Sequence, residues 1–518
     1  MSTSADDHQD IPRRTILQRA ALGGAGIVGA TLLCPDGGSQ AEGAVERVAA
    51  SESWYAERAY CVSGNRLLGD DGDVHGAART QATAIYRPRS AQEIAELIKG
   101  LPPGVPVATV CGGHESSNAA MVASRQAIVL DLAHLKSIDF HEAGDEALVT
   151  VGAGVVFREL VEAVRAHHGA LPVGTGPGVG VVGYIVNGGL SGYFSRRLGL
   201  LGQRVTKLTM VTATGEIRVL APGDELFTAM LGAGSALGVV VDVTLRMEHE
   251  RVVAAAEQRV VGFKTREQAV AFARDALRLQ RERVLPDDAV SMELVVTGTN
   301  ALVATFVFYD GFSESTAALV APLEAVAARL GLPVVAATRW TSWYEAAAAL
   351  WPVINGMKGS PLAMLQHCMG TVGPPHDRIL DFLCDVVIAE APLETAAMSI
   401  VEIRTLGGAV LSQPALPTGN CHHRYFCDLV CQYDAHGTSI DQRRGIADRI
   451  AGIMEKARGV EGLAVDFSGT HSQPDDRGPS ASPPVIFGTE AMARAVERLK
   501  KQVDPGNRFR FHPFAKFL

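Results

Sequence analysis

The segment Cys111-Gly112-Gly113-His114-Glu115 is the most informative stretch of this chain. It follows a run rich in Val and Ala over 105–110 and precedes the polar residues Ser116-Ser117-Asn118. Two consecutive glycines allow backbone N–H groups to approach a phosphate closely. The adjacent histidine could contact the molecule that carries this phosphate, or bond to it covalently. Alone, such a pattern more often marks a tight turn beside a bystander histidine, so the segments that follow decide its meaning.

The composition is that of a globular protein with more than one domain. The chain has 518 residues, of which 47% are hydrophobic and 20% charged, and this length predicts roughly two to four domains. The net charge is −9 and no run of Lys and Arg occurs, so we expect no nucleic-acid partner. The cysteines form no CxxC pair. The group of Cys421, Cys427 and Cys431 with His422-His423 matches no zinc spacing, so we expect no metal.

The N-terminus carries a candidate export signal. Arg13-Arg14 precedes an apolar run over 20–33, with a small-residue cleavage site near Ser39-Gln40-Ala41. This pattern predicts a twin-arginine signal peptide and a secreted protein, with the twin-arginine export machinery as a partner. The alternative is a disordered tail. The apolar run is too short and too rich in Gly and Ala for stable membrane insertion, and Leu33 before Cys34 argues against a lipid anchor.

The remaining chain divides into two regions of different texture. The pattern of the first region predicts short strands and helices with many glycines between them. The predicted elements are strands at 84–86, 107–110, 127–132, 147–151 and 237–246, a hairpin at 206–220, and helices at 90–99 and 157–167. From about residue 250, longer helices at 265–281 and 315–330 alternate with strands at 289–296, 301–309, 397–405 and 425–433. Helices segregated from an antiparallel sheet predict an α+β domain.

Three further segments follow the first in order. They are GTGPGVGVVGY over 174–184 with Asn187-Gly188-Gly189, the glycine-rich stretch over 232–240 after Asp224-Glu225-Leu226-Phe227, and DPGNRF over 504–509. Together with the first segment they resemble the FAD-linked oxidases of the vanillyl-alcohol oxidase/p-cresol methylhydroxylase superfamily. The berberine bridge enzyme-like branch is the most similar, and the resemblance covers roughly residues 55–518.

The resemblance implies the domain organisation. It predicts a signal peptide and linker over 1–43 and a two-part FAD-binding domain of the PCMH type over 55–250. A substrate-binding domain with an antiparallel sheet flanked by helices follows over 251–460. The C-terminal segment, 461–518, is expected to return to the FAD domain.

The resemblance also implies which residues bind FAD. His114 matches the histidine that the family links covalently to the flavin ring methyl. The pyrophosphate loop and the second flavin-binding stretch correspond to Cys111, Gly112, Gly113, Glu115, Ser116, Gly174, Thr175, Val179, Gly180 and Gly183. Gly238 and Val239 match the segment near the adenine, and Asn507 matches a residue near the pyrimidine side of the ring.

Two positions depart from the family pattern. Relatives with two covalent links carry a cysteine where this chain has Gly176, so we expect a single link through His114. Leu190 stands where the pattern often continues with a third glycine, which would reshape the wall beside the ring.

On the substrate side, two predicted strands resemble those that cover the flavin. Because side chains alternate along a strand, Glu402 and Arg404 share one face, as do Asp428, Val430 and Gln432. Glu402 is the best candidate base with Arg404 as its partner, and a structural ion pair between them is an equally good interpretation. Gln432 cannot act as a base and is expected to orient substrate. Tyr184 and Tyr433 are further candidates, and a tyrosine needs a lowered pKa to act as a base. Trp340, Trp343 and Tyr344 are expected to line an aromatic substrate wall or to pack in the core.

The expected function is that of a secreted FAD-dependent oxidase. It would take hydride from a C–H bond next to an alcohol or amine of a small molecule, such as a secondary metabolite or antibiotic, and reduce molecular oxygen to hydrogen peroxide. The open alternatives are a sugar or oligosaccharide oxidase, a dehydrogenase with another electron acceptor, and a non-catalytic metabolite-binding resistance protein. The chain is expected to be a monomer or a homodimer.

Overall fold

The fold was analysed in a computed structural model. It describes residues 45–58, 82–114, 127–252, 255–282, 290–298, 300–307, 315–356, 358, 362–371, 373, 375–396, 399–434, 437–468 and 482–512. The expected signal peptide, together with Glu115 and Ser116, lies outside these residues. Within them, no helix is both long and apolar enough to cross a membrane.

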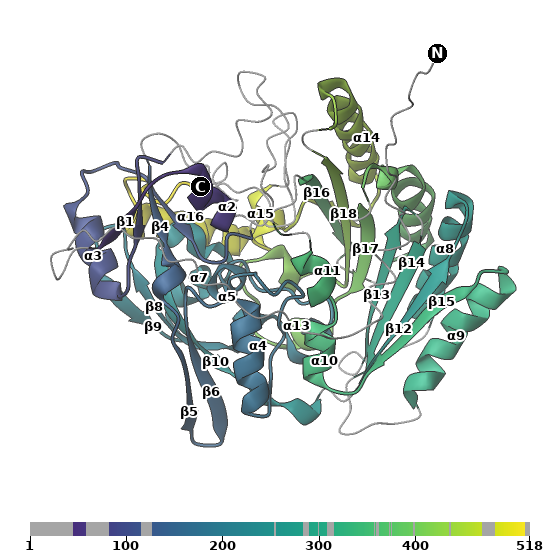
Figure 1. Ribbon diagram of the computed structural model, residues 1–518, viewed down its shortest axis with the longest axis horizontal. Coiled ribbons are helices and arrows are strands. Elements are labelled where there is room, and N and C mark those ends of the chain that lie inside the picture. The colour runs from purple at the N-terminus through teal and green to yellow at the C-terminus, as the bar shows by residue number, and fades with distance from the viewer. Residues whose placement is uncertain are drawn as a thin grey trace, which may run out of the picture.

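The first domain is built on two sheets (Figure 1). One has the order β1-β2-β4-β3, with β2 and β3 parallel to β4 and β1 antiparallel to β2. Its strands are β1 (Glu46–Val48), β2 (Ala84–Arg87), β3 (Val107–Val110) and β4 (Ile128–Asp131). The other is antiparallel with the order β5-β6-β10-β8-β9. Its strands are β5 (Ile138–Ala143), β6 (Glu146–Gly152), β8 (Val205–Val211), β9 (Ile217–Leu220) and β10 (Val239–Arg246).

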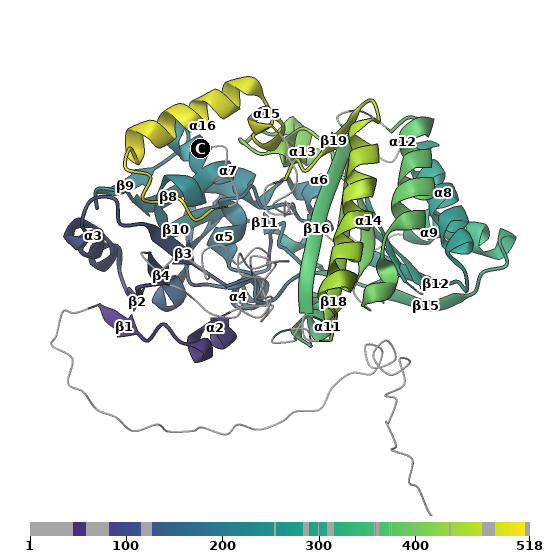
Figure 2. The ribbon, with the colours of Figure 1, turned by 90° about the horizontal axis from the view of Figure 1, so that it is seen from above.

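Helices pack against these sheets, and several begin at predictable caps. The hydroxyl of Ser90 accepts a hydrogen bond from the Glu93 N–H at the start of α3 (Ala91–Gly100), as an N-cap serine does. Figure 2 shows α16 (Glu490–Val503) lying along α7 (Glu225–Leu237). The C-terminal segment thereby returns to the first domain. The remaining helices that bear on the site are α4 (Phe157–Ala166) and α5 (Val181–Ile185).

The second domain is one large antiparallel sheet with helices on one face. Its eight strands have the order β15-β12-β14-β13-β17-β18-β16-β19, and the helices lie on the side away from the first domain (Figure 1). The strands are β12 (Ala255–Gly262), β13 (Val290–Thr297), β14 (Asn300–Val307), β15 (Val334–Trp340), β16 (Leu362–Thr371), β17 (Ile400–Thr405), β18 (Tyr425–Asp434) and β19 (Leu463–Val465). The helices include α8 (Arg266–Glu282), α9 (Ser315–Arg329), α12 (Asp377–Phe382) and α14 (Ile440–Arg458). The predicted α+β class is confirmed.

Alternation along the central strands separates a core from a site. Cys427, Leu429 and Cys431 of β18 are buried in the apolar core under the helices. Asp428 and Gln432, on the opposite face of the same strand, are also buried although they are polar. Burying polar side chains on the face that meets another domain is costly unless they serve an interaction there, so this face is the place to look for a site.

Candidate active site

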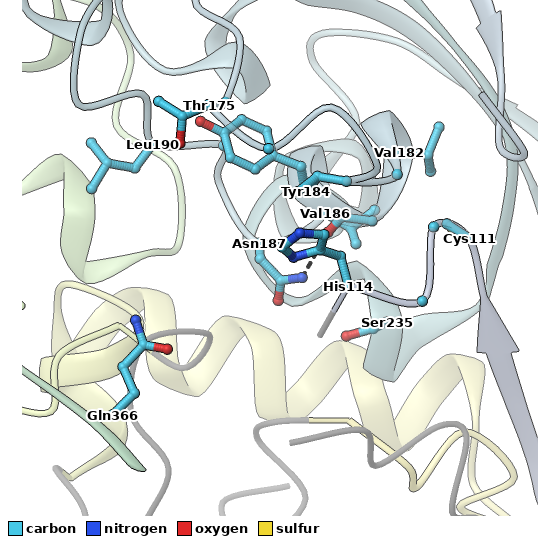
Figure 3. Close-up of a pocket in the computed structure, with 18 of the residues that line it drawn as sticks. Cys111, His114, Thr175, Val182, Tyr184, Val186, Asn187, Leu190, Ser235 and Gln366 are labelled. Carbon is cyan, nitrogen blue, oxygen red and sulfur yellow. Dashed lines mark hydrogen bonds between the residues drawn. The ribbon is translucent and has the colours of Figure 1, made fainter. Parts of the chain in front are cut away.

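A cavity of about 440 Å³ lies where the first domain meets the eight-stranded sheet. Most of its wall comes from four parts of the chain: the end of β3 with the turn to residue 114, the 174–192 stretch through α5, the end of α7 with the start of β10, and the inner face of β16, β17 and β18. Leu132, Ile354, Asn420 and Phe511 complete it. In Figure 3, Gln366 of β16 faces His114, Tyr184 and Asn187 across this space. The two domains therefore supply opposite walls of one site.

Glycines form the wall of the first domain because its backbones approach too closely for side chains. A Cβ added at Gly112 would lie 2.3 Å from the Gly180 nitrogen and 2.5 Å from the Gly178 oxygen. A Cβ at Gly180 would lie 2.5 Å from the Gly112 nitrogen. Gly113, with φ +67°, adopts a backbone conformation that only glycine tolerates freely. The two sequence segments thus build one cradle lined by backbone.

Gly112→Ala is expected to abolish cofactor retention. The added methyl would overlap backbone atoms of the 178–180 turn, and backbone has no rotamer through which to escape. Gly100→Ala is the matched control, because no heavy atom lies within 4 Å of a Cβ at that position. Flavin absorbance per chain after gel filtration measures the effect. A Gly112→Ala protein that purifies with the flavin content of the control would contradict the cradle.

His114 lies at the end of this cradle, half-buried as a residue but with its Nε2 atom buried. Burial lowers the pKa of its imidazole to about 4, and the positive charge of Lys358 contributes in the same direction. The ring is therefore neutral at pH 7, and a neutral imidazole keeps the lone pair that a nucleophile needs. A Cβ added at Gly176 would lie 3.2 Å from His114 Nε2. Gly176 thus leaves open the space directly beside the ring.

On the first-domain wall of the cavity, three polar groups lack a hydrogen-bond partner within the described part of the chain. They are the Tyr184 hydroxyl, the Asn187 Oδ1 atom and the Ser235 hydroxyl, all buried. The other end of the Asn187 amide donates to the Gly183 oxygen at 2.8 Å (Figure 3). An unsatisfied buried polar group costs about 1–3 kcal/mol, so three of them around one cavity indicate a polar occupant.

The opposite wall consists of alternate residues of three adjacent strands. They are Met364 and Gln366 of β16, Ile400, Glu402 and Arg404 of β17, and Asp428, Val430 and Gln432 of β18. Register places Glu402 directly beside Asp428, and Arg404 beside Glu293 of β13. The sequence-predicted residues Glu402, Arg404 and Gln432 are thus brought together with His114 and Tyr184 in one cavity.

Glu402 and Arg404 form a buried ion pair. Arg404 Nε donates to Glu402 Oε1 at 2.7 Å, and Arg404 Nη2 donates to Oε2 at 2.5 Å. Glu293 Oε2 lies 4.0 Å from Arg404 Nε. Burial, followed by the charge of Glu402, raises the pKa of Glu293 well above its usual value. Because both oxygens of Glu402 are held by Arg404, the geometry favours the structural ion pair over Glu402 as the base.

The backbone of the first domain closes over this pair. A Cβ added at Gly192 would lie 2.7 Å from Glu293 Oε2 and 2.8 Å from Arg404 Nε. Any residue larger than glycine at position 192 would displace the charged groups. The ion pair is therefore shielded from solvent by a chain segment that itself belongs to the cavity wall.

Other sequence-predicted cofactor residues divide by their placement. Cys111, Gly112, Gly113, Gly174, Thr175, Val179, Gly180, Gly183 and Gly238 line the cavity. Val239 points into the core instead, and its neighbour Val240 lines the cavity, because strand alternation begins at that residue. Leu190 lines the wall as expected.

Two predicted residues lie away from the cavity, which corrects their expected placement. Tyr433 is 1% exposed and packs in the helix-side core, because it follows Gln432 along β18 and points the opposite way. Asn507 is exposed and has a φ of +48° in the turn that ends α16. The residue of this C-terminal segment that lines the cavity is Phe511.

Of the two alternatives for Trp340, Trp343 and Tyr344, the structure supports packing in the core. Trp343 is buried in the core of the first domain and donates from Nε1 to the Leu171 oxygen at 3.0 Å. Trp340 and Tyr344 pack against the same core, and none of the three lines the cavity. His423 stacks on Phe467 at 3.9 Å between ring centroids, a packing role. Among the described residues, no group of His, Cys, Asp and Glu side chains could hold a metal ion.

The structure adds site residues that were not assigned from sequence. Gln366, Asn187, Ser235, Asn420 and Asp428 all line the cavity. Asp428 was already on the face of Gln432 by alternation, and Asn187 and Ser235 lie within the quoted glycine-rich segments. Gln366 belongs to β16, a strand that the sequence did not predict.

Comparisons with known proteins agree with this geometry. Residues 82–221 match the family model described as "FAD binding domain". The chain is 32% identical to (R)-6-hydroxynicotine oxidase of Paenarthrobacter nicotinovorans over 166 residues, which are 32% of this chain and 35% of that protein. It is 30% identical to berberine bridge enzyme-like 22 of Arabidopsis thaliana over 185 residues, 34% of each chain. The matched stretch thus spans about a third of these curated relatives.

A solved structure extends the likeness in fold to nearly the whole chain. Physcomitrella patens BBE-like 1 superposes with a TM-score of 0.71 at 19% identity, covering 91% of this chain and 96% of that one. The family match and the shared fold confirm the resemblance drawn from the sequence. Residues 82–221 are an FAD-binding domain, and the cofactor is FAD.

Proposed function

We propose that this chain, which carries an FAD-binding domain and has the fold of the berberine bridge enzyme-like proteins, is itself an FAD-dependent oxidase of that branch. Its proposed substrate is a small molecule that is oxidised at a carbon next to an alcohol or amine. The observation that carries the proposal is a cavity to which both domains contribute a wall. One wall is a glycine cradle with a neutral histidine, and the other is a set of buried charged and polar side chains.

The residues of the first wall fit FAD. A pyrophosphate requires convergent backbone N–H donors, and the close approach of Gly112 to Gly180 leaves backbone rather than side chains at the surface. The partnerless polar atoms of Tyr184, Asn187 and Ser235 supply the donors and acceptors that a polar cofactor would satisfy. Cys111 beside them stays protonated, because burial raises the pKa of its thiol to about 11.

His114 is proposed as the only covalent tether. Its neutral ring nitrogen is the nucleophile available on this wall. Gly176, the position next to it, carries no side chain that could form a second bond. We therefore propose one covalent bond between chain and cofactor.

The second wall supplies the substrate side. Bound FAD would accept a hydride and pass the electrons to oxygen, giving hydrogen peroxide. Gln432, buried at the cavity with an unpartnered Oε1 among the described residues, would orient the substrate. The Arg404–Glu402 pair would fix the local charge. Burial raises the pKa of the Tyr184 hydroxyl well above its usual value, which disfavours Tyr184 as the base.

The oxygen reaction tests the proposal without knowledge of the substrate. The purified protein would be reduced with light and a sacrificial donor under nitrogen and then mixed with air-saturated buffer. An oxidase returns to the oxidised flavin spectrum within the mixing experiment and releases one hydrogen peroxide per flavin. Slow reoxidation that speeds up with an artificial electron acceptor would instead identify a dehydrogenase, and would contradict the proposal.

A substrate panel then addresses the compound class. The panel would pair (R)-6-hydroxynicotine and cyclic amine alkaloids with oligosaccharides, and flavin bleaching under nitrogen would be recorded. We propose a secondary metabolite over a sugar by analogy with the branch. A ligand that shifts the flavin spectrum without ever reducing it would favour a binding protein.

Export through the twin-arginine pathway is also part of the proposal. Arg13-Arg14 before the apolar run supports it. This pathway carries folded proteins, which suits a chain that must acquire FAD before it leaves the cytoplasm. Recovery of the flavin-loaded chain only from the cytoplasm of the native host would contradict this part.

A further inference from the structure

Asp428 occupies the centre of the substrate wall with one oxygen uncommitted. It is 2% exposed and lines the cavity from the middle of β18. Its Oδ2 atom accepts a hydrogen bond from Gln366 Nε2 at 2.8 Å. Its Oδ1 atom is buried and has no hydrogen-bond partner among the residues that the structure describes.

The other polar groups of this wall are unsuited to accept a proton. Both oxygens of Glu402 are engaged by Arg404, and proton uptake there would break a buried ion pair. Gln432 has no titratable group. Glu293 lies behind Arg404 and does not line the cavity. Asp428 is thus the carboxylate on this wall whose oxygen faces the cavity without a countercharge bound to it.

We propose that Asp428 is the catalytic base of this site, the group that accepts the proton of the substrate's hydroxyl or amine. This inference rests on the proposed oxidase function. Gln366 acts as its positioning residue, because its amide holds Oδ2 and leaves Oδ1 without a partner among the described residues of a side chain that lines the cavity.

In the proposed substrate oxidation, bound FAD is the oxidant and Asp428 takes up the proton. The substrate carbon loses a hydrogen with its two bonding electrons to bound FAD, and the oxygen or nitrogen beside that carbon loses one proton to Asp428 Oδ1. A C=O or C=N double bond forms in the substrate. Asp428 then releases its proton to solvent before the next substrate binds, and no further reactant is required.

The surrounding charges set the pH range of this step. Burial, followed by the negative charge of Glu402, raises the pKa of Asp428 to about 8, while Arg404 and the Gln366 hydrogen bond act in the opposite direction. Glu293 on β13 lies 4.0 Å from Arg404, and burial raises the pKa of its carboxyl too. From the first domain, Tyr184 faces the charged cluster as a neutral phenol. Asp428 is therefore the group here that changes charge near neutral pH, and a base must be deprotonated to act.

Two readouts on Asp428→Asn test the inference. The first is flavin reduction by the panel compound that bleaches the wild type fastest. We expect the wild-type rate to rise between about pH 7 and pH 9, and the variant to be slower by roughly 10²-fold or more without that rise, the scale of a general base. The second is infrared spectroscopy of the chain labelled with ¹³C-aspartate. It should show a protonated carboxyl band that disappears near pH 8 in the wild type and is missing in the variant.

Asp242→Asn is the matched control. Asp242 lies on β10 outside the cavity, and burial also raises the pKa of its carboxyl. This variant therefore tests the effect of removing a half-buried aspartate that is not part of the site. We expect this control to keep the wild-type reduction rate and the titrating band.

The outcomes separate this inference from the proposed function. If Asp428→Asn reduces at the wild-type rate, or if the band persists in it, Asp428 is not the base. If no panel compound bleaches the wild type, the infrared band decides alone, and its absence overturns the inference. Reoxidation of chemically reduced flavin by oxygen needs no substrate and no base, so in the wild type it tests the oxidase proposal independently of Asp428. A wild type that fails this oxygen reaction would instead overturn the oxidase proposal.

Discussion

His114→Ala is expected to abolish every covalent bond between the chain and FAD while leaving FAD able to bind. After denaturing electrophoresis, the wild-type band should fluoresce as a flavin and the variant band should not. The reason is that His114 is the neutral nucleophile at the end of the glycine cradle, and no second anchoring side chain stands at Gly176. The cradle itself does not depend on the imidazole, so flavin added during refolding or purification should still be bound.

His423→Ala provides the matched control. His423 is also a buried histidine whose pKa is lowered to about 4, mainly by burial, but it stacks on Phe467 and does not line the cavity. We expect this control to retain the fluorescent band. Covalent flavin in His114→Ala would show that another residue is the tether. Loss of the band in both variants would point to general misfolding.

Arg404→Met is expected to destabilise the second domain more than any exposed ion-pair variant. Removing one partner of a buried ion pair typically costs about 3–5 kcal/mol, which lowers the melting temperature of a domain of this size by roughly 10 °C. Three carboxyl groups would remain around the gap: Glu293, Glu402 and Asp428. Arg444→Met is the control, because its pair with Asp441 at 3.5 Å is exposed and is worth at most about 1 kcal/mol.

The decrease in melting temperature caused by Arg404→Met should be larger at high pH than at low pH. Arg404 lowers the pKa values of Asp428 and Glu293, so its removal raises them further above those of the unfolded chain. A carboxyl group with a raised folded pKa binds more protons in the folded state, and stability then falls as pH rises through that range. We therefore expect a larger loss of melting temperature at pH 9 than at pH 5. Thermal unfolding followed by circular dichroism measures it, and a loss independent of pH would contradict the assignment of these charges.

Much of the first domain could be predicted from the sequence because its constraints are local. Glycines that must approach backbone, such as Gly112 and Gly180, form motifs whose spacing is visible without a structure. The Ser90 cap was likewise readable from its own neighbourhood. These features specify one cavity wall almost completely, including the histidine at its end.

The second wall could be predicted only in part, because it depends on contacts between distant strands. The strand over 362–371 pairs with β18 and β19, but its sequence, LAMLQHCMGT, gives no clean alternation, so Gln366 was missed. Alternation did place Asp428 beside Gln432. That Arg404 binds Glu402 and leaves Asp428 as the open carboxylate depends on side-chain conformations and register that no single strand encodes.

Asn507 shows the limit of transferring residues by motif. The DPGN turn has the expected sequence, yet in this chain it closes α16, with the Asp504 oxygen accepting from the Asn507 N–H at 3.0 Å. The side chain that reaches the cavity comes four residues later, at Phe511. A motif predicts a turn more securely than it predicts the direction of each side chain.

The central claim is that this cavity holds one FAD, tethered once and through His114. Peptide mapping by mass spectrometry of the native protein, digested after denaturation, tests it most directly. The account predicts that the peptide containing His114 carries the mass of one FAD and that the peptide containing Gly176 carries none. A His114 peptide without added mass from a protein that holds flavin before denaturation, or the mass of FAD on another peptide, would contradict the account.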